Sequence, residues 1–212
     1  MKVLSSAALA ATSALALPAG AEAATLAATA SCVAADAPVN LAGSGFTPGS
    51  TVTIAGAASA SAIADAAGAV VATVSLAPPP SITPITVSLT ASENVNAANT
   101  ATLALPVVAR AFDTNAPING RPSQTTTWRF AGFVTGQPIF GHFRFGGQTR
   151  RNYRFGTAQG PCGTLVVRAR RVPVKRLSSG KWLVQIDQRR RYSKAPPWRR
   201  VPFTLQRIRR PR

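Results

Sequence analysis

Apolar and polar residues alternate along most of this chain in short runs, separated by glycine, proline, serine and asparagine. Alternation with a period of two sends one set of side chains into a core and the other into solvent, so it predicts β-strands. The clearest runs are 51–54, 70–76, 85–89, 102–107, 125–133, 139–145, 153–155, 164–170, 182–186 and 201–208. The pattern therefore predicts an all-β fold built from short strands.

The first half of the chain has the turn residues expected between the strands of a β-sandwich. Residues 46–50 (FTPGS) predict a tight turn, because proline presets φ and glycine permits the reversal. Residues 65–68 (DAAG) predict a hairpin turn closed by glycine, and 94–99 predict another turn. The three prolines 78–80 form a stiff connection that cannot lie in a central strand. About six or seven short strands at this spacing predict one β-sandwich.

Aromatic residues mark the strands of the second half. Its predicted core is Trp128, Phe143, Phe155, Trp182 and Phe203. In the run 139–145, Ile139 and Phe143 share one face, while His142 and Arg144 share the other. We therefore expect His142 to be an exposed strand residue and the arginines to form a ribbed cationic face on a sheet. These strands predict a second β-sandwich or open barrel.

Charge divides the chain into two unlike parts. The net charge is +18, yet residues 24–109 contain no lysine or arginine. Residues 110–212 hold every basic residue except Lys2, against two acids, Asp113 and Asp187. Such a change predicts a boundary near 106–110, and hence domains at 24–107 and 108–212.

The first 23 residues have the three parts of a secretory signal peptide. Lys2 supplies positive charge, 3–17 are apolar and uncharged, and Ala21-Glu22-Ala23 fits a small-x-small cleavage site. The apolar run is too short to cross a bilayer comfortably, and no later run approaches the length of a transmembrane segment. We expect residues 1–23 to be removed and the mature protein to be secreted, extracellular or associated with the cell wall, with no transmembrane segment.

The two cysteines, Cys32 and Cys162, fall in different predicted domains. In an oxidising compartment pairing is the default expectation, and this disulfide would join the domains. Three alternatives remain open at this point. In the first, each cysteine is a buried single thiol, and in the second, each forms a disulfide with another molecule. In the third, Cys32 carries a lipid anchor, although residues 29–31 match the recognition sequence for lipid attachment poorly.

Two segments of the first half carry a resemblance to a known family. The segments GSGFTPGSTVTIAG (43–56) and ADAAGAVVATVSL (64–76) resemble bacterial immunoglobulin-like modules of secreted and surface proteins of actinobacteria. The resemblance covers roughly 26–107 and implies an immunoglobulin-like β-sandwich that acts as a spacer or binding scaffold. The second half resembles the basic C-terminal part of uncharacterised secreted actinobacterial proteins, with an aromatic-rich strand pair, a G-P-C-G loop (160–163) and a later G-x-W strand (180–182).

An alternative function comes from a second resemblance. Secreted actinobacterial L,D-transpeptidases place immunoglobulin-like modules ahead of a domain with a cysteine nucleophile and a histidine. A resemblance here would imply that Cys162 is the nucleophile and His142 its base, since a thiolate needs a nearby base at neutral pH. The loop 158–163 (AQGPCG) departs from that family, because it lacks the histidine and the arginine that accompany the nucleophile.

The sequence contains few of the residues that other enzyme classes require. One histidine and six acids leave no set for a zinc or calcium site, and we expect no cofactor. A glycosidase pair would have to come from Asp113 and Asp187, which fit a turn and a strand end better. Residues 42–45 (AGSG) lack the first glycine of a nucleophile elbow, and no lysine-containing phosphate loop is present.

The cationic half is the strongest functional signal. Its self-repulsion would be relieved by an anionic partner, and arginines interleaved with Tyr153, Tyr192 and Trp198 suit anionic polymers with salt-dependent affinity. The candidate contacts are Arg144, Arg150, Arg151, Arg154, Arg168, Arg170, Arg171, Arg189, Arg190, Arg191, Arg199 and Arg200. The sequence favours a secreted, non-enzymatic protein whose basic domain adheres to anionic cell-envelope polymers or acidic lipids, without sequence-specific nucleic-acid recognition.

Overall fold

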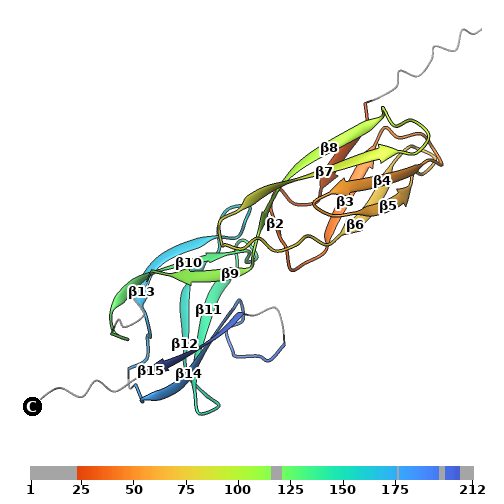
Figure 1. Cartoon of the computed structure of the whole chain (residues 1–212). Coiled ribbons are helices and arrows are strands. Elements are labelled where there is room, and N and C mark those ends of the chain that lie inside the picture. Colours follow the sequence, from red (N-terminus) through yellow and green to blue (C-terminus); the bar gives the residue numbers. More distant parts are fainter. Residues whose placement is uncertain (1–22, 116–120, 176, 196–198, 206–212) are drawn as a thin grey trace, which may run out of the picture.

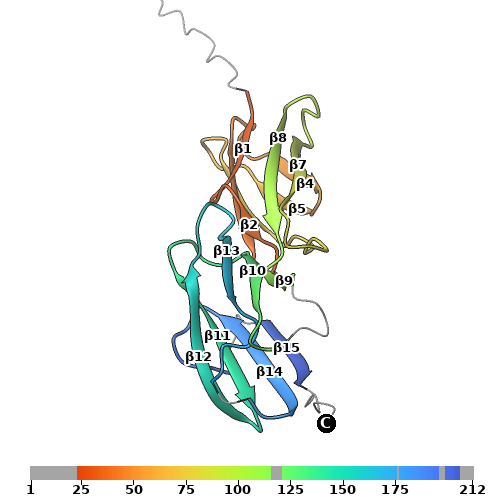
Figure 2. The same cartoon turned by 90° about the vertical axis from the view of Figure 1, so that its left-hand side faces the viewer.

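The chain folds into two β-sandwiches that lie end to end (Figures 1 and 2). The structure is a computed structural model, and it describes residues 23–115, 121–175, 177–195 and 199–205. Within these ranges all regular elements are strands, numbered β1 to β15, and they form four sheets. The all-β, sandwich-type fold expected from the alternating pattern is confirmed. The expected signal peptide lies outside the described residues apart from Ala23.

The N-terminal sandwich pairs a three-stranded sheet with a five-stranded sheet. Their orders are β1-β3-β6 and β2-β8-β7-β4-β5, and β2 runs parallel to β8. Its strands are β1 (Thr25–Ala28), β2 (Val33–Ala34), β3 (Val39–Ser44), β4 (Thr51–Gly56), β5 (Ala60–Ile63), β6 (Val70–Val74), β7 (Ile85–Glu93) and β8 (Thr100–Val108). This is the strand order of an immunoglobulin-like sandwich, in which strands A, B and E face a sheet containing C, F and G.

The C-terminal sandwich repeats this strand order without a counterpart of β2. Its sheets are β13-β10-β9 and β12-β11-β14-β15. Its strands are β9 (Ala111–Thr114), β10 (Thr125–Ala131), β11 (Pro138–Phe145), β12 (Gln148–Thr157), β13 (Leu165–Arg170), β14 (Gly180–Asp187) and β15 (Arg199–Leu205). The central strand of the three-stranded sheet is β3 in one sandwich and β10 in the other. The strands β5 and β12 occupy equivalent edges of the two larger sheets. The part of the predicted last strand beyond Leu205 lies outside the described residues.

The two cores differ in composition. The N-terminal core is small and aliphatic, with Leu41, Ile54 and Leu89 almost completely buried. The C-terminal core is aromatic, and the predicted residues Trp128, Phe143, Phe155 and Trp182 are buried there, whereas Phe203 is partly buried and packs against them. The Phe155 ring lies 4.8 Å from the rings of both Trp128 and Phe130. Large ring contacts hold the two C-terminal sheets together.

The turn at 65–68 does not close a hairpin. It forms as a turn, since the Asp65 carboxylate accepts hydrogen bonds from the amides of Ala67 and Ala69 and Gly68 has φ 73°. However, β5 before it pairs with β4, and β6 after it pairs with β3 in the opposite sheet. The prediction of a hairpin was wrong because turn residues define a reversal but not the sheet that the next strand joins.

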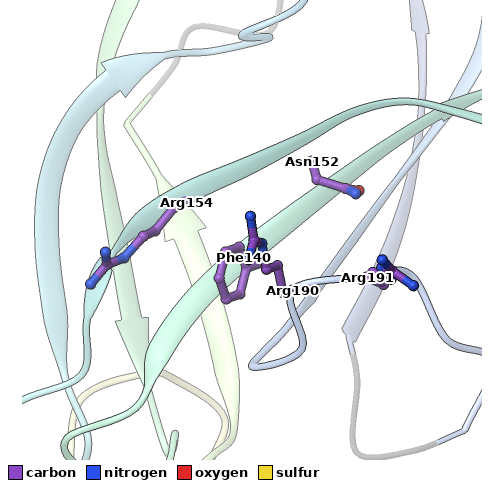
Figure 3. Close-up of a pocket in the computed structure, with 5 residues that line it drawn as sticks. All are labelled: Phe140, Asn152, Arg154, Arg190 and Arg191. Carbon is purple, nitrogen blue, oxygen red and sulfur yellow. The ribbon is translucent and has the colours of Figure 1, made fainter.

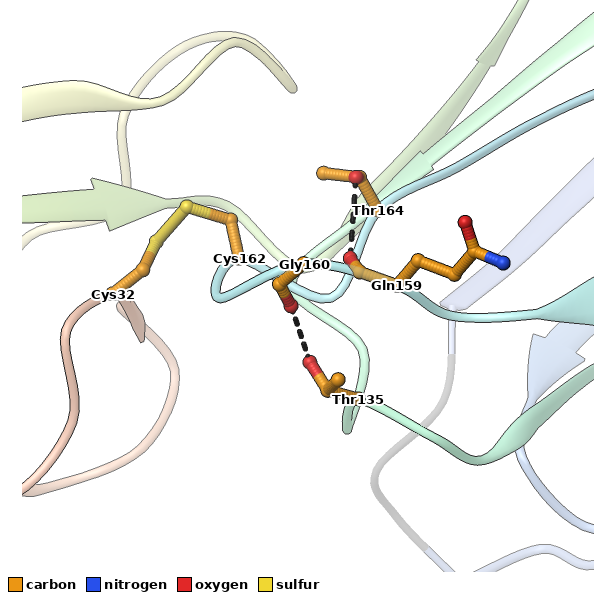
Figure 4. Close-up of a disulfide and its surroundings, with 6 residues drawn as sticks. All are labelled: Cys32, Thr135, Gln159, Gly160, Cys162 and Thr164. Carbon is orange, nitrogen blue, oxygen red and sulfur yellow. Dashed lines mark hydrogen bonds between the residues drawn. A yellow bond between two sulfur atoms is a disulfide. The ribbon is translucent and has the colours of Figure 1, made fainter.

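A disulfide and a short backbone link connect the sandwiches. Cys32 and Cys162 form the bond, with sulfur atoms 2.07 Å apart, which is the pairing that the sequence favoured (Figure 4). Beside it, the Arg110 Nε lies 3.5 Å from the Asp36 carboxylate and donates to the carbonyl of Gly132. Val108 and Ala131 form a small separate cluster with the two cysteines. These contacts fix the two sandwiches at one junction.

The loop that carries Cys162 is held by hydrogen bonds of its own. The amides and carbonyls of Gln159 and Thr164 bond to each other in both directions at 2.8 Å. The Thr135 hydroxyl donates to the carbonyl of Gly160 at 2.5 Å (Figure 4). Gly163 has φ 57°, and a Cβ there would lie 1.5 Å from the carbonyl oxygen of Phe133, so only glycine fits. The cysteine is therefore presented by a rigid loop.

Candidate anion-binding surface

The twelve candidate arginines all belong to the C-terminal sandwich, but they do not form one face. Arg168 and Arg170 flank the buried Ala169, so they point away from the core of the three-stranded sheet. Arg144 and Arg154 alternate with buried phenylalanines and point outward from the four-stranded sheet. The expected single ribbed face was wrong. The two sheets face each other across one core, so their outer sides point in opposite directions.

His142 is completely buried, which corrects the expectation of an exposed strand residue. It does lie on the outward face of β11, as the alternation predicted, but its exposure is 0%. The segment 188–193, which follows β14, folds back over that face and places the centre of the Tyr192 ring 6.0 Å from the centre of the imidazole, in an edge-to-face arrangement. A strand's period tells which face a residue takes but not what covers that face.

Both ring nitrogens of His142 meet oxygen acceptors. Nε2 lies 3.0 Å from Asp187 Oδ1, and Nδ1 lies 2.7 Å from Asn152 Oδ1. An imidazole can donate from both nitrogens only when it is protonated, so this arrangement favours the imidazolium form. His142 and Asp187 thus form a buried ion pair between β11 and β14, and Asn152 on β12 completes the link across three strands.

The Asp187 carboxylate also organises the covering segment. Its Oδ1 accepts a hydrogen bond from the amide of Arg189 at 2.8 Å, and its Oδ2 accepts one from the Gln185 side chain at 2.7 Å. Gln185 Nε2 donates further to the carbonyl of Ser193, and Gln185 Oε1 accepts from Arg200 Nε, both at 2.7 Å. This buried network determines the position of the arginine-bearing segment 188–193.

Two of the candidate arginines are part of this support. The Arg144 guanidinium lies 4.0 Å from the centre of the Tyr192 ring and donates to the Tyr192 hydroxyl at 2.7 Å. The Arg200 guanidinium donates to the same hydroxyl at 3.2 Å. Both arginines are half-buried. Their charges therefore act mainly to hold Tyr192 over the sheet, and the ring expected to stack on a ligand is covered by guanidinium groups.

Other candidates surround a hollow on the same face. A depression of about 380 Å³ is lined by Phe140, Asn152, Arg154, Arg190 and Arg191. Figure 3 shows the side chains of Arg154 and Arg191 on either side of the Phe140 ring. The three arginines are exposed, and no acidic residue contributes to the lining. The hollow is electropositive, with one apolar ring among its walls.

Within the described part of the C-terminal sandwich, the ion-pair partners of Asp113 and Asp187 are not among the twelve arginines. Asp187 pairs with His142, and Asp113 lies 3.8 Å from Arg129. Both partners lie outside the candidate set. The protein's own acids therefore leave the positive charge of this sandwich largely uncompensated, and its field attracts anions.

The buried pair has pKa values displaced in opposite directions. Burial alone would lower the pKa of His142, but its hydrogen bonds to Asp187 and Asn152 outweigh this effect and raise it above 6.5. Burial would raise the pKa of Asp187, but the hydrogen bonds from His142, Gln185 and the Arg189 amide lower it below 3.8. Each charge stabilises the other in the folded state.

We expect the stability of the C-terminal sandwich to fall as the pH rises above 6.5. The raised pKa means that His142 contributes its full stabilisation below the unfolded value of 6.5 and loses it as pH passes through the folded value. At the acid end, the contribution of Asp187 is present above 3.8 and disappears as pH falls through its lowered pKa. Urea unfolding across this range checks the expectation. The variant His142→Gln should show a flatter profile above 6.5, and an equally steep one would contradict it.

The structure does not bring His142 and Cys162 together as a nucleophile and its base. The Cys162 sulfur is bonded to Cys32, so it carries no thiolate in this state. Both nitrogens of His142 are engaged by Asn152 and Asp187. Among the described residues no group of three or more histidine, cysteine or acidic side chains is placed to hold a metal ion.

Sequence reasoning missed the residues that build the network. Asn152, Gln185 and Asp187 lie in strands where most adjacent residues are apolar or cationic. The sequence analysis identified none of them as a hydrogen-bonding partner of His142. One signal was available. Gln185 and Asp187 occupy outward positions of a strand whose inward residues are Trp182, Val184 and Ile186, so two polar groups repeat on one face.

Comparison with known proteins gives little further information. No protein-family model and no curated protein matches the chain. Among solved structures, a tetra-tandem repeat from the extending region of a large adhesion protein aligns over 86% of this chain at 15% identity, with a TM-score of 0.31. This chain covers 48% of that protein. A TM-score this low does not establish a shared fold. No helix of the described residues is long and apolar enough to cross a membrane.

Proposed function

We propose that this protein is a secreted, non-enzymatic adhesion or binding protein with two domains, 24–107 and 108–212. The first domain is an immunoglobulin-like spacer or scaffold. The second adheres electrostatically to anionic polymers of the cell envelope or to acidic lipids. The proposal rests mainly on one observation. Three arginines and no acidic residue line the hollow around Phe140, and Asp113 and Asp187 pair with Arg129 and His142 instead of with those arginines.

The architecture supports this role in two further ways. The disulfide between Cys32 and Cys162 suits an oxidising compartment, where such bonds persist. The buried network around His142 holds arginine-bearing segments in place, so that the cations form a preorganised surface rather than a mobile tail. Preorganised charge binds with a smaller entropic cost than charge on a flexible segment.

Sedimentation with purified bacterial cell walls tests the proposal. We expect the protein to pellet with walls at low salt and to be released at high salt, because the contacts are ionic and partly exposed. Walls stripped of their anionic polymers serve as the control and should retain much less protein. Binding that is indifferent to salt, or equal on stripped walls, would rule the proposal out.

A further inference from the structure

A groove runs along one side of the C-terminal sandwich, between the edge strand β12 and the described residues 173–175 and 178, which lie between β13 and β14. It consists of two hollows of about 560 Å³ and 270 Å³. Arg151, Val174 and Lys175 belong to the linings of both. Since three residues are shared, the hollows adjoin and form one elongated depression. This groove shares no lining residue with the hollow around Phe140, although β12 contributes residues to both.

Among the residues that the structure describes, four cations line this groove and no acidic residue does. They are Arg150, Arg151, Arg170 and Lys175, and all four are exposed. Arg150 and Arg151 both reach the larger hollow because β12 is irregular there. Phe143 pairs with Arg151 and Arg144 pairs with Thr149, which leaves Arg150 as the extra residue of a β-bulge. Consecutive residues of a regular strand point to opposite faces, and a bulge relaxes this rule.

Aromatic rings form the apolar part of the groove. Phe145 and Trp182 line the larger hollow, and Tyr153 lines the smaller one. Phe145 and Tyr153 are half-buried, and each is held by another ring, at 5.1 Å by Trp182 and at 5.0 Å by Phe155. Trp182 Nε1 donates to the carbonyl of Ser178 at 2.9 Å, which fixes Ser178 on the opposite wall.

We propose that this groove binds a single linear polyanion whose repeating unit contains a ring, namely a carboxylated polysaccharide. The proposal rests on the adhesion function. It narrows the residues that contact the anion from twelve candidate arginines to three of them and Lys175, which lie beside two partly exposed rings. The guanidinium groups of Arg150, Arg151 and Arg170 and the ammonium of Lys175 contact successive carboxylates along the chain. Phe145 and Tyr153 pack against the faces of the sugar rings. A polyanion without rings uses the charges alone and binds more weakly.

Binding of labelled polygalacturonate, measured by fluorescence anisotropy over a range of salt concentrations, tests the groove. The groove variant carries Arg150→Gln, Arg151→Gln, Arg170→Gln and Lys175→Gln. The control variant carries Arg168→Gln, Lys181→Gln, Arg190→Gln and Arg191→Gln. Both remove four exposed positive charges, so their net charges match, and the control also removes two cations of the hollow around Phe140.

We expect the groove variant to lose about thirtyfold in affinity and the control about threefold, because four direct contacts are lost in one case and only the general field weakens in the other. The slope of log affinity against log salt should fall by about three in the groove variant. Equal losses in the two variants would overturn the groove while leaving adhesion of the domain intact. If the wild-type protein binds neither polygalacturonate nor cell walls at low salt, the adhesion function fails as well.

Inorganic polyphosphate of matched charge tests the contribution of the rings. The wild-type protein should bind polygalacturonate more tightly than polyphosphate at the same salt concentration, and Phe145→Leu should reduce that preference. Circular dichroism and thermal unfolding of each variant establish that it is folded. Equal affinity for the two polymers would overturn the assignment of a ring-containing ligand.

Discussion

Asp187→Ala will destabilise the C-terminal sandwich by about 3 to 5 kcal/mol, the usual cost of removing one partner from a buried ion pair. The substitution leaves the His142 imidazolium without its counter-ion at a site with 0% exposure. It also removes the acceptor for the Arg189 amide and for the Gln185 side chain. The covering segment 188–193 therefore loses its attachment as well as its charge balance.

Urea unfolding followed by tryptophan fluorescence measures this effect selectively, because every tryptophan of the chain lies in the second half. Hydrogen exchange adds a local readout, since the amide of Arg189 should exchange faster in the variant. The matched control is the double variant His142→Leu with Asp187→Leu, which removes both charges. It should be less destabilised than the sum of the two single variants. A loss below about 1 kcal/mol in Asp187→Ala would show that the pair contributes no more than an exposed one.

The sequence predicts strands well where large apolar residues alternate and poorly where small residues do. Strands β7, β8, β11 and β14 were anticipated from such alternation. Strands β1 (TLAA) and β5 (ASAI) consist mainly of alanine, serine and threonine, whose low contrast gives no clear period. Half of β12 was missed for another reason. Its first residues, QTRRN, lie at an exposed sheet edge and are polar on both faces.

The candidate site was predicted in its charge but not in its construction. The accumulation of arginine in one half is visible in the sequence because it depends only on composition. The burial of His142 is not visible in the sequence, because it depends on the segment 188–193, which begins 46 positions later and folds over the same face. The β-bulge at Arg150 is likewise set by pairing with β11 and has no signature in the residues RRN alone.

The disulfide is expected to stabilise both sandwiches, although it lies inside neither. When only the N-terminal sandwich unfolds, the folded partner still holds Cys162 next to the linker, so residues 32–109 remain a closed loop. When only the C-terminal sandwich unfolds, residues 110–162 are closed in the same way. In the chain-entropy model each loop is worth about 4 kcal/mol. One bond at the junction thus restricts the unfolded state of either half.

Cys32→Ala with Cys162→Ala should therefore lower the free energy of unfolding of both sandwiches by about 4 kcal/mol. Tryptophan fluorescence reports the C-terminal half, and hydrogen exchange at Leu41 and Leu89 reports the N-terminal core, which has no tryptophan or tyrosine. The wild-type protein in reductant should approach the variant, which separates loss of the bond from loss of side-chain packing. If only one half loses stability, the bond acts locally on the loop or on β2. If neither half does, the contacts of Arg110 with Asp36 and Gly132 hold the junction without it.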